Sequence, residues 1–134
     1  MAWLVKTEPG TYSYDDLERE GRAVWDGVTN PAAVKNLGAM AVGDRVFVYH
    51  TGDEKQVVGE AEVVRAGYPD PKGGARKLIV VDLKPVRRIG QPVTLAALKA
   101  DAAFADSPLV RQGRLSVVPL TAAQAKVIDK RGAA

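Results

Sequence analysis

Apolar stretches of alternating or β-branched residues, separated by short polar turns, recur along the chain and predict more strands than helices. The predicted strands span residues 3–6, 45–50, 57–64, 77–86 and 115–118. A polar turn at residues 51–55 joins the second and third of these strands into a hairpin. Gly59, inside the returning strand, predicts a bulge or a close approach of another group to the backbone.

Short helices are predicted where a capping residue precedes a helix-compatible segment. Asn30 followed by Pro31 is the strongest such start, because Asn accepts hydrogen bonds from free N–H groups and Pro has no N–H to leave unpaired. Ser13 before an acidic turn and Thr121 in a capping box are similar starts. The predicted helices span residues 14–20, 31–37, 95–100 and 122 to about 129, with Gly21 and Gly38 ending the first two and Thr94 capping the third.

The remaining segments are predicted as loops and turns. Trp25 lies in a loop, residues 68–74 form the most mobile loop, Phe104 and Leu109 lie among short helical turns, and residues 130–134 are expected to fray. The strands are linked by hairpins and do not alternate regularly with helices. The chain is therefore predicted to be one α+β domain over residues 1–134, a mostly antiparallel β-barrel or curved sheet with short surrounding helices.

Composition sets limits on the class of protein. The 134 residues are enough for a hydrophobic core, and 46% apolar with 26% charged residues is ordinary for a globular domain. No apolar run reaches the length of a membrane span, and residues 1–6 are expected to be a strand rather than part of a signal peptide. There is no cysteine and one histidine, His50, which excludes disulfides, thiolate metal sites and a Cys nucleophile. No metal or cofactor is expected, and the composition fits a cytoplasmic protein.

Charge is distributed unevenly, although the net charge is only +3. Residues 1–67 carry 7 basic and 11 acidic side chains, whereas residues 68–134 carry 12 basic and 5 acidic side chains. The second half either offers a basic surface to phosphates or is a mixed, solvated surface, and charge alone favours the solvated surface. A net charge of +3 is far from that of a dedicated electrostatic DNA-binding protein.

An aromatic ring, a carboxylate and an amide lie close together between residues 25 and 30. Trp25 either fills the core, with its indole N–H bonded to a carbonyl, or offers a face on which a nucleobase stacks. Asp26 is either a turn residue or an acceptor for the exocyclic amine of a base such as cytosine or adenine. Asn30 caps a helix through its oxygen, which leaves its NH2 group free to contact a base.

Further candidates lie at strand ends and helix starts. Lys6 and Glu8 follow the first strand and either point into a pocket or form a surface charge pair. Tyr12 and Ser13 stand at a helix start, where free N–H groups favour an anion, and Ser13 alternatively serves only as a cap. His50 ends a strand and is either a structural group or a donor to a base or phosphate.

Two more candidates, Arg114 and Ser116, flank Leu115 near the end of the chain. The Ser116 hydroxyl reaches a ligand if the residue lies at the edge of the barrel, and otherwise has a structural role. Arg114 pairs either with a phosphate or with an internal carboxylate.

Several short motifs occur in one order along nearly the whole chain. They are Trp-Leu-Val-Lys-Thr-Glu-Pro at residues 3–9, Trp-Asp-Gly-Val at 25–28, Met-Ala-Val-Gly-Asp at 40–44, Tyr-Pro-Asp-Pro at 68–71 and Arg-Leu-Ser-Val at 114–117, together with Tyr12, Ser13, Asn30, Tyr49, His50, Val58 and Gly59. In this combination and order the chain resembles the EVE-domain family, which belongs to the PUA-like superfamily and is related to YTH domains. Many relatives carry Arg and an aromatic residue around the positions of Thr29 and Pro31, and this chain has neither.

The resemblance implies a PUA-like pseudobarrel whose cleft holds an aromatic pocket for a flipped, modified base. Trp25 corresponds to an aromatic residue of that pocket. The other candidate pocket or rim residues are Lys6, Glu8, Tyr12, Ser13, Asp26, Asn30, His50 and Ser116.

The predicted function is therefore non-catalytic recognition of a modified nucleobase, such as methylated or hydroxymethylated cytosine in DNA, with a modified RNA base as the second choice. The candidates for binding phosphates are Lys84, Arg87, Arg88, Arg111 and Arg114. No membrane partner is expected, and a monomer is expected. Two alternatives stay open: a hydrolase of nucleotides or modified bases that uses Asp26, Glu8 and His50 as acid and base, and a small-molecule or protein-interaction module on the same fold.

Overall fold

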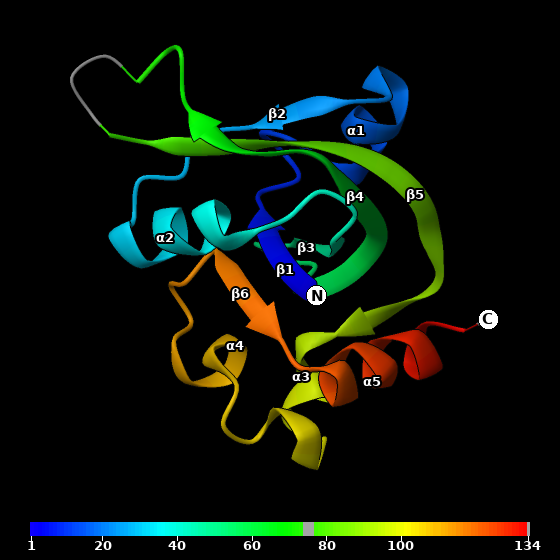
Figure 1. The fold of residues 1–134 in the computed structure, drawn as a ribbon. Helices are drawn as coiled ribbons and strands as arrows, with labels where there is room; N and C mark the ends of the chain where they lie inside the picture. Colours follow the sequence, from blue (N-terminus) through cyan, green and yellow to red (C-terminus); the bar gives the residue numbers. More distant parts are fainter. Residues whose placement is uncertain (74–76, 134) are drawn as a thin grey trace.

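The computed structural model describes residues 1–73 and 77–133, and its strands form one curved sheet flanked by short helices (Figure 1). The strands are β1 (Ala2–Thr7), β2 (Ala23–Trp25), β3 (Arg45–His50), β4 (Gln56–Pro69), β5 (Ile79–Thr94) and β6 (Val117–Leu120). The helices are α1 (Tyr14–Glu20), α2 (Pro31–Ala39), α3 (Leu95–Lys99), α4 (Pro108–Arg111) and α5 (Ala122–Gly132), with a 3-10 turn η1 (Ala102–Phe104). In this part of the chain, no helix has the length and apolar character needed to cross a bilayer.

The order of the strands leaves the barrel incompletely closed. The sheet runs β2-β5-β4-β3-β1-β6, with β1 and β3 parallel and every other neighbouring pair antiparallel. The long strand β5 bends around one side of the molecule (Figure 1), and β2 and β6 are the two edges. Helix α2 packs against both β5 and β6, and the Asn36 amide donates to the Val117 carbonyl at 2.8 Å. The predicted α+β, mostly antiparallel curved sheet with surrounding short helices is confirmed.

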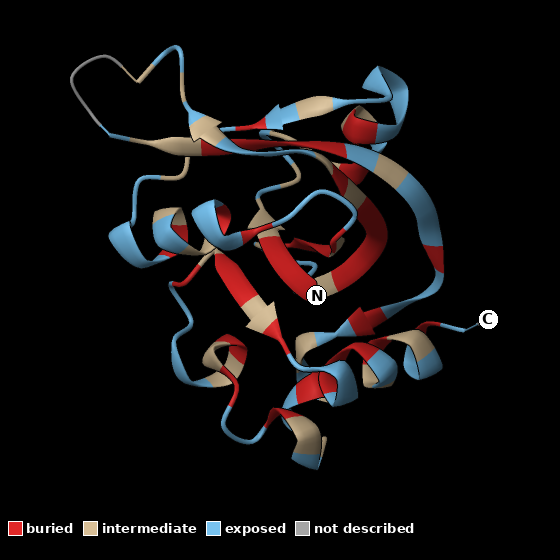
Figure 2. Ribbon diagram, viewed as in Figure 1, coloured by how far each residue is buried: buried red, intermediate tan, exposed pale blue. Residues whose placement is uncertain are grey.

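The core lies inside the curve of the sheet. Buried residues cover β1, β3 and the first half of β4, while the outer surfaces of α2 and α5 are exposed (Figure 2). The largest fully buried side chains include Tyr14, Phe47 and Phe104. Burying such aromatic side chains supplies much of the hydrophobic stabilisation of a domain of this size.

Local signals in the sequence place most helix starts correctly. Ser13, Asn30, Thr94 and Thr121 each accept a hydrogen bond from a backbone N–H of the first turn, as predicted. Gly21 ends α1 in the left-handed conformation, with φ of 75°. The short helical turns predicted around Phe104 and Leu109 are also present, as η1 and α4.

Several predicted boundaries are wrong, because tertiary contacts extend or shift the elements. Trp25 ends the strand β2, which pairs with β5, and is not in a loop. The strands β4 and β5 continue beyond residues 64 and 86, since register shifts let the pair bend without separating. Tyr68 and Pro69 therefore belong to β4, residues 70–73 are outside any strand, and residue 74 of the predicted loop lies outside the described residues.

The other corrections concern element ends. Gly38 lies inside α2, which ends at Ala39, and β6 starts two residues later than the strand predicted at residue 115. Residues 130–132 are helical and not frayed as predicted, because α5 continues to Gly132, and residue 134 of the predicted frayed end lies outside the described residues. A Cβ placed on Gly132 would lie 2.6 Å from a methyl carbon of Ile89, so this glycine allows the end of α5 to pack closely against β5.

Gly59 is the place where helix α1 meets the sheet. The Tyr14 ring is fully buried over this glycine, and a Cβ placed there would lie 2.4 Å from ring carbons. The Tyr14 hydroxyl lies 2.7 Å from the Glu60 carbonyl and 2.8 Å from the Arg87 carbonyl. The close backbone approach predicted at Gly59 is thus confirmed, and Tyr14 joins α1 to β4 and β5.

A buried carboxylate, Asp44, holds the start of β3 beside β1. It accepts hydrogen bonds from the indole N–H of Trp3 and from the backbone N–H of Ala41, both at 2.9 Å. Burial alone would raise the pKa of this carboxyl group, but the hydrogen bonds from Ala41 and Trp3 stabilise its charged form and hold the pKa below the usual value.

We expect Asp44→Ala to lower the free energy of unfolding by about 2–3 kcal/mol near pH 7, because it removes hydrogen bonds to a charged acceptor. Since the folded-state pKa is depressed, this stabilisation is present above the unfolded-state pKa and is lost as the pH falls through the folded-state pKa. Urea unfolding of both proteins across this pH range measures the difference. A difference that stays constant down to acid pH would contradict the assigned charge state.

Candidate nucleic-acid interface

A cavity of about 580 Å³ opens between the two edges of the sheet. Its size is in the range of small-ligand sites. Three segments form its walls: residues 6–12, which include the end of β1, residues 24–30, which run from the end of β2 to the cap of α2, and Ser116 just before β6. Its lining combines aromatic, aliphatic and polar side chains: Lys6, Thr7, Glu8, Thr11, Tyr12, Val24, Trp25, Asp26, Gly27, Val28, Thr29, Asn30 and Ser116.

The structure brings together most of the pocket residues predicted from the sequence. Lys6, Glu8, Tyr12, Trp25, Asp26, Asn30 and Ser116 all line the cavity, whereas Ser13 and His50 do not. Sequence analysis missed Thr7, Thr11, Val24, Gly27, Val28 and Thr29. Three of these six residues, Gly27, Val28 and Thr29, could have been predicted from the sequence. They belong to the continuous segment between Trp25 and the capped helix, and every residue of that segment lines the cavity.

Trp25 is both a member of the core and part of the cavity wall. Only 7% of its surface is exposed, and its backbone pairs with Val81 in β5. The Tyr12 ring meets it in an edge-to-face arrangement, with ring centroids 5.9 Å apart and planes at 84°. Such a pair is worth about 0.5–1.5 kcal/mol beyond the area it buries. The indole therefore has a fixed position at the edge of an open cavity.

Polar groups with unused hydrogen-bonding capacity lie in the same wall. The Asn30 side-chain oxygen accepts from the Ala33 N–H at 3.1 Å, which is the predicted cap. Its NH2 group makes no hydrogen bond within residues 1–73 and 77–133, and neither does the Asp26 carboxylate. Both side chains are exposed, so the wall offers a donor and an acceptor to a ligand.

Internal contacts fix the opposite wall. The Tyr12 hydroxyl donates to Glu20 at 2.5 Å; burial first, and then this carboxylate, raise the pKa of Tyr12, so the phenol stays neutral. The Thr7 hydroxyl donates to the Tyr12 carbonyl at 2.7 Å. Lys6 donates to the Gly113 carbonyl at 2.9 Å, and burial lowers the pKa of its ammonium group.

Ser13 and His50 have structural partners instead of places in the cavity. Ser13 forms a capping box with Asp16 at the start of α1. The Nε2 atom of His50 accepts from the Tyr14 N–H at 3.0 Å, and Nδ1 lies 3.0 Å from a Glu54 carboxylate oxygen. Because Nε2 is an acceptor, the proton of the neutral ring is on Nδ1, where it donates to Glu54.

We expect His50→Ala to lower the free energy of unfolding by about 1–3 kcal/mol, because the buried N–H of Tyr14 loses its acceptor. Glu54→Gln is the matched control, since it leaves that acceptor in place and should cost less. Chemical denaturation of the two variants tests this order. Equal losses would show that the bond from Tyr14 to His50 contributes nothing specific.

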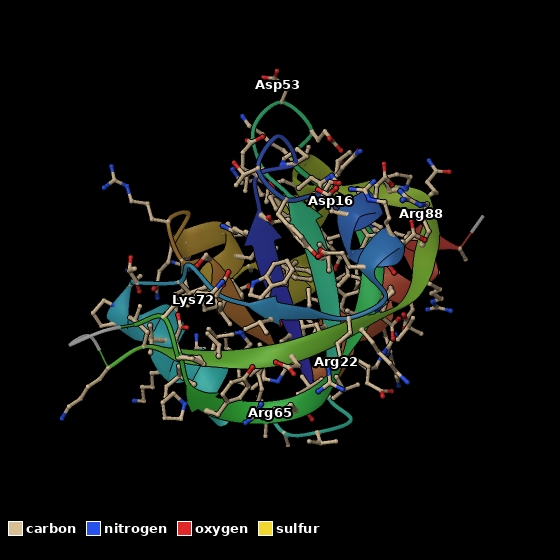
Figure 3. All side chains as sticks on the ribbon, turned by 90° about the horizontal axis from the view of Figure 1, so that it is seen from above. Asp16, Arg22, Asp53, Arg65, Lys72 and Arg88 are labelled. Carbon is tan, nitrogen blue, oxygen red and sulfur yellow. The ribbon has the colours of Figure 1, made fainter. Side chains whose placement is uncertain are left out.

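None of the five cations predicted to bind phosphates lines the cavity. Lys84 lies 3.6 Å from Glu62, Arg87 lies 3.3 Å from Glu60, and Arg111 lies 3.0 Å from Asp106. Arg88 pairs with Asp15 and Glu18 on α1. Figure 3 shows Arg88 near Asp16 of the same helix. Arg114 is exposed and has no ion pair in the described part of the chain, and it precedes Ser116 by two residues.

Within the described ranges, no three His, Asp or Glu side chains group closely enough to bind a metal ion.

The curved sheet with short surrounding helices and a cavity at its open edge defines a PUA-like α+β domain. The chain belongs to the EVE-domain family, whose profile matches residues 1–131. It is similar in sequence to human thymocyte nuclear protein 1, with 29% identity over 89% of this chain and 68% of the human protein.

Solved structures show the same relationship. An NMR structure of a Rhodopseudomonas palustris protein superimposes with a TM-score of 0.91 and 43% identity, covering 98% of this chain and 92% of that one. The crystal structure of human thymocyte nuclear protein 1 in complex with DNA that contains 5-methylcytosine gives a TM-score of 0.88 and 27% identity, covering 98% of this chain and 96% of that one.

Proposed function

We propose that this protein is a non-catalytic reader of a modified nucleobase in DNA. The observation that carries the proposal is the placement of the Trp25 indole at the wall of an open cavity of about 580 Å³, beside unused polar groups. The complex of human thymocyte nuclear protein 1 with 5-methylcytosine DNA supports DNA, rather than RNA, as the partner. A monomeric, cytoplasmic protein with no membrane partner is part of the same proposal.

In this mechanism the base leaves its helix, or comes from a single strand, and stacks against Trp25. Extruding a base costs a few kcal/mol, and stacking on an aromatic ring returns about 1–3 kcal/mol. Hydrogen bonds in the pocket must supply the rest. Asp26 accepts from the exocyclic amine of cytosine, and the Asn30 NH2 group donates to an acceptor on the same edge.

The modification is read by apolar contact. Val24 and Val28 line the cavity next to Trp25, and Val24 is 46% exposed. A methyl group on the base would cover such a side chain and bury about one methyl group of apolar surface. A buried CH2 group contributes about 0.8 kcal/mol, which sets the scale of the discrimination from this contact.

The geometry of His50 argues against the alternative of a hydrolase. His50 is one of the three acid–base candidates from the sequence, yet both its ring nitrogens have partners inside the protein and it does not line the cavity. General base catalysis needs a group within hydrogen-bond reach of the proton it removes.

Calorimetric titration with oligonucleotides that carry cytosine, 5-methylcytosine or 5-hydroxymethylcytosine at one position tests the proposal. We expect tighter binding of a modified oligonucleotide than of the plain one, and tighter binding of DNA than of the matching RNA. Equal affinity for all of them would contradict base reading. Release of a product from modified nucleosides on prolonged incubation would contradict the non-catalytic assignment.

A further inference from the structure

A second, smaller hollow of about 240 Å³ lies beside the base cavity. Three lysines from different parts of the fold line it: Lys6 at the end of β1, Lys55 in the turn before β4, and Lys99 at the end of α3. Among the described residues, its lining contains no Asp or Glu. We call this hollow the lysine pocket.

The lysines of this pocket have no ion pair in the part of the chain that the structure describes, unlike Lys84, Arg87 and the other paired cations of the second half. The acidic residues near them in sequence are engaged or directed elsewhere. Glu54 pairs with His50, and Asp53 stands at the tip of its turn and points away from the body of the protein (Figure 3). Asp101, two residues after Lys99, pairs with Arg131.

One further carboxylate lies at the boundary between the two cavities. Glu8 lines the base cavity, and one of its oxygens would lie 2.9 Å from a Cβ placed on Gly52 of the lysine pocket. Its other oxygen accepts from the Gly10 N–H at 2.8 Å. The Glu8 carboxylate thus borders both cavities and offsets the charge of one lysine, and the charges of the other two leave the lysine pocket with an excess of positive charge.

A neutral donor, the Tyr49 hydroxyl, also belongs to the lysine pocket. The Tyr49 ring is buried, but its hydroxyl has no hydrogen-bond partner in the described residues and is not sealed from solvent. Burial raises the pKa of Tyr49, so the hydroxyl keeps its proton and remains a donor. A phosphate oxygen accepts hydrogen bonds from both ammonium and hydroxyl groups.

Lys6 lines both cavities, which makes them neighbours. In a nucleic acid, each base is joined through one sugar to a phosphate, so a base in the first cavity brings a phosphate of its own strand close to the second. We propose that the lysine pocket binds a phosphodiester of the strand whose base occupies the Trp25 cavity. This placement rests on the proposed function, whereas the affinity of the pocket for phosphate does not.

The test uses two exposed lysines, Lys55→Gln and Lys99→Gln, with Lys126→Gln on the outer surface of α5 as the matched control. Each of the two pocket variants should bind methylated and plain oligonucleotides more weakly by a similar factor, roughly five- to tenfold at low salt, and should reduce the slope of log K against log salt by about 1. Lys126→Gln should match the wild type in both. Thermal unfolding of all three variants should match that of the wild type.

The outcomes separate the two proposals. If the wild type prefers the methylated oligonucleotide but the pocket variants keep its affinity and salt slope, the lysine pocket does not bind the backbone. If the variants lower binding while no base is preferred, the pocket is confirmed and base reading fails. Weaker binding of 5-methyl-dCMP alone, with the oligonucleotide unaffected, would show a site for a terminal phosphate and overturn the phosphodiester assignment.

Discussion

Trp25→Leu should reduce the affinity for a methylated oligonucleotide by roughly 5- to 150-fold. This loss of affinity corresponds to about 1–3 kcal/mol, which is what the stacking of a base on an aromatic side chain contributes. Leucine keeps apolar contact with the core but has no π face. Because Trp25 is almost fully buried, the smaller alanine would confuse loss of stacking with loss of stability.

Trp25→Phe is the matched control for this prediction, since it keeps an aromatic face of smaller area. We expect affinities in the order Trp, Phe, Leu, measured by calorimetry on variants whose unfolding curves show that they are folded at the titration temperature. A leucine variant that remains folded and binds the methylated oligonucleotide as tightly as the wild type would contradict stacking as the basis of recognition.

Gly59→Ala should lower the free energy of unfolding by about 3 kcal/mol, the upper end of the range for overpacked cores. The added methyl group would lie 2.4 Å from carbons of the Tyr14 ring, so the ring or the strand must move. The ring is poorly able to move, because its hydroxyl is bonded to carbonyls of β4 and β5. Denaturant unfolding measures the loss.

Two further variants give this prediction its controls. Gly38→Ala adds the same methyl group inside α2, where it meets nothing within 4 Å, and should be neutral or stabilising by about 0.5–1 kcal/mol. Tyr14→Leu removes the ring, so the cost of Gly59→Ala should fall in that background, a coupling that a double-mutant cycle measures. Additive losses in the cycle would show that the clash is not with Tyr14.

Sequence analysis succeeded where the determining interactions are local. The caps at Ser13, Asn30, Thr94 and Thr121 depend on a side chain that reaches an N–H within the next turn, and all four are present. The core of each long strand was also predicted, because β-branched runs pack well on a pleated surface whatever their partners are.

The errors lie where distant segments decide the outcome. Trp25 becomes part of a strand only because Val81 pairs with it, and the end of α5 is helical because Gly132 packs against Ile89. Likewise the sequence did not show that Arg88 pairs with acidic residues of α1, which lie far away in the sequence. The lysine pocket, assembled from three separate elements, has no local signature at all.

The gap between β2 and β6 has a thermodynamic consequence. Strand edges usually expose unpaired backbone groups, and here α2 covers one part of the opening while the rest stays accessible. A ligand that contacts Trp25 at one edge of the sheet and Ser116 at the other bridges the two edges of the open barrel. Ligand binding and the free energy of unfolding are then linked, so the melting temperature rises with the concentration of the ligand.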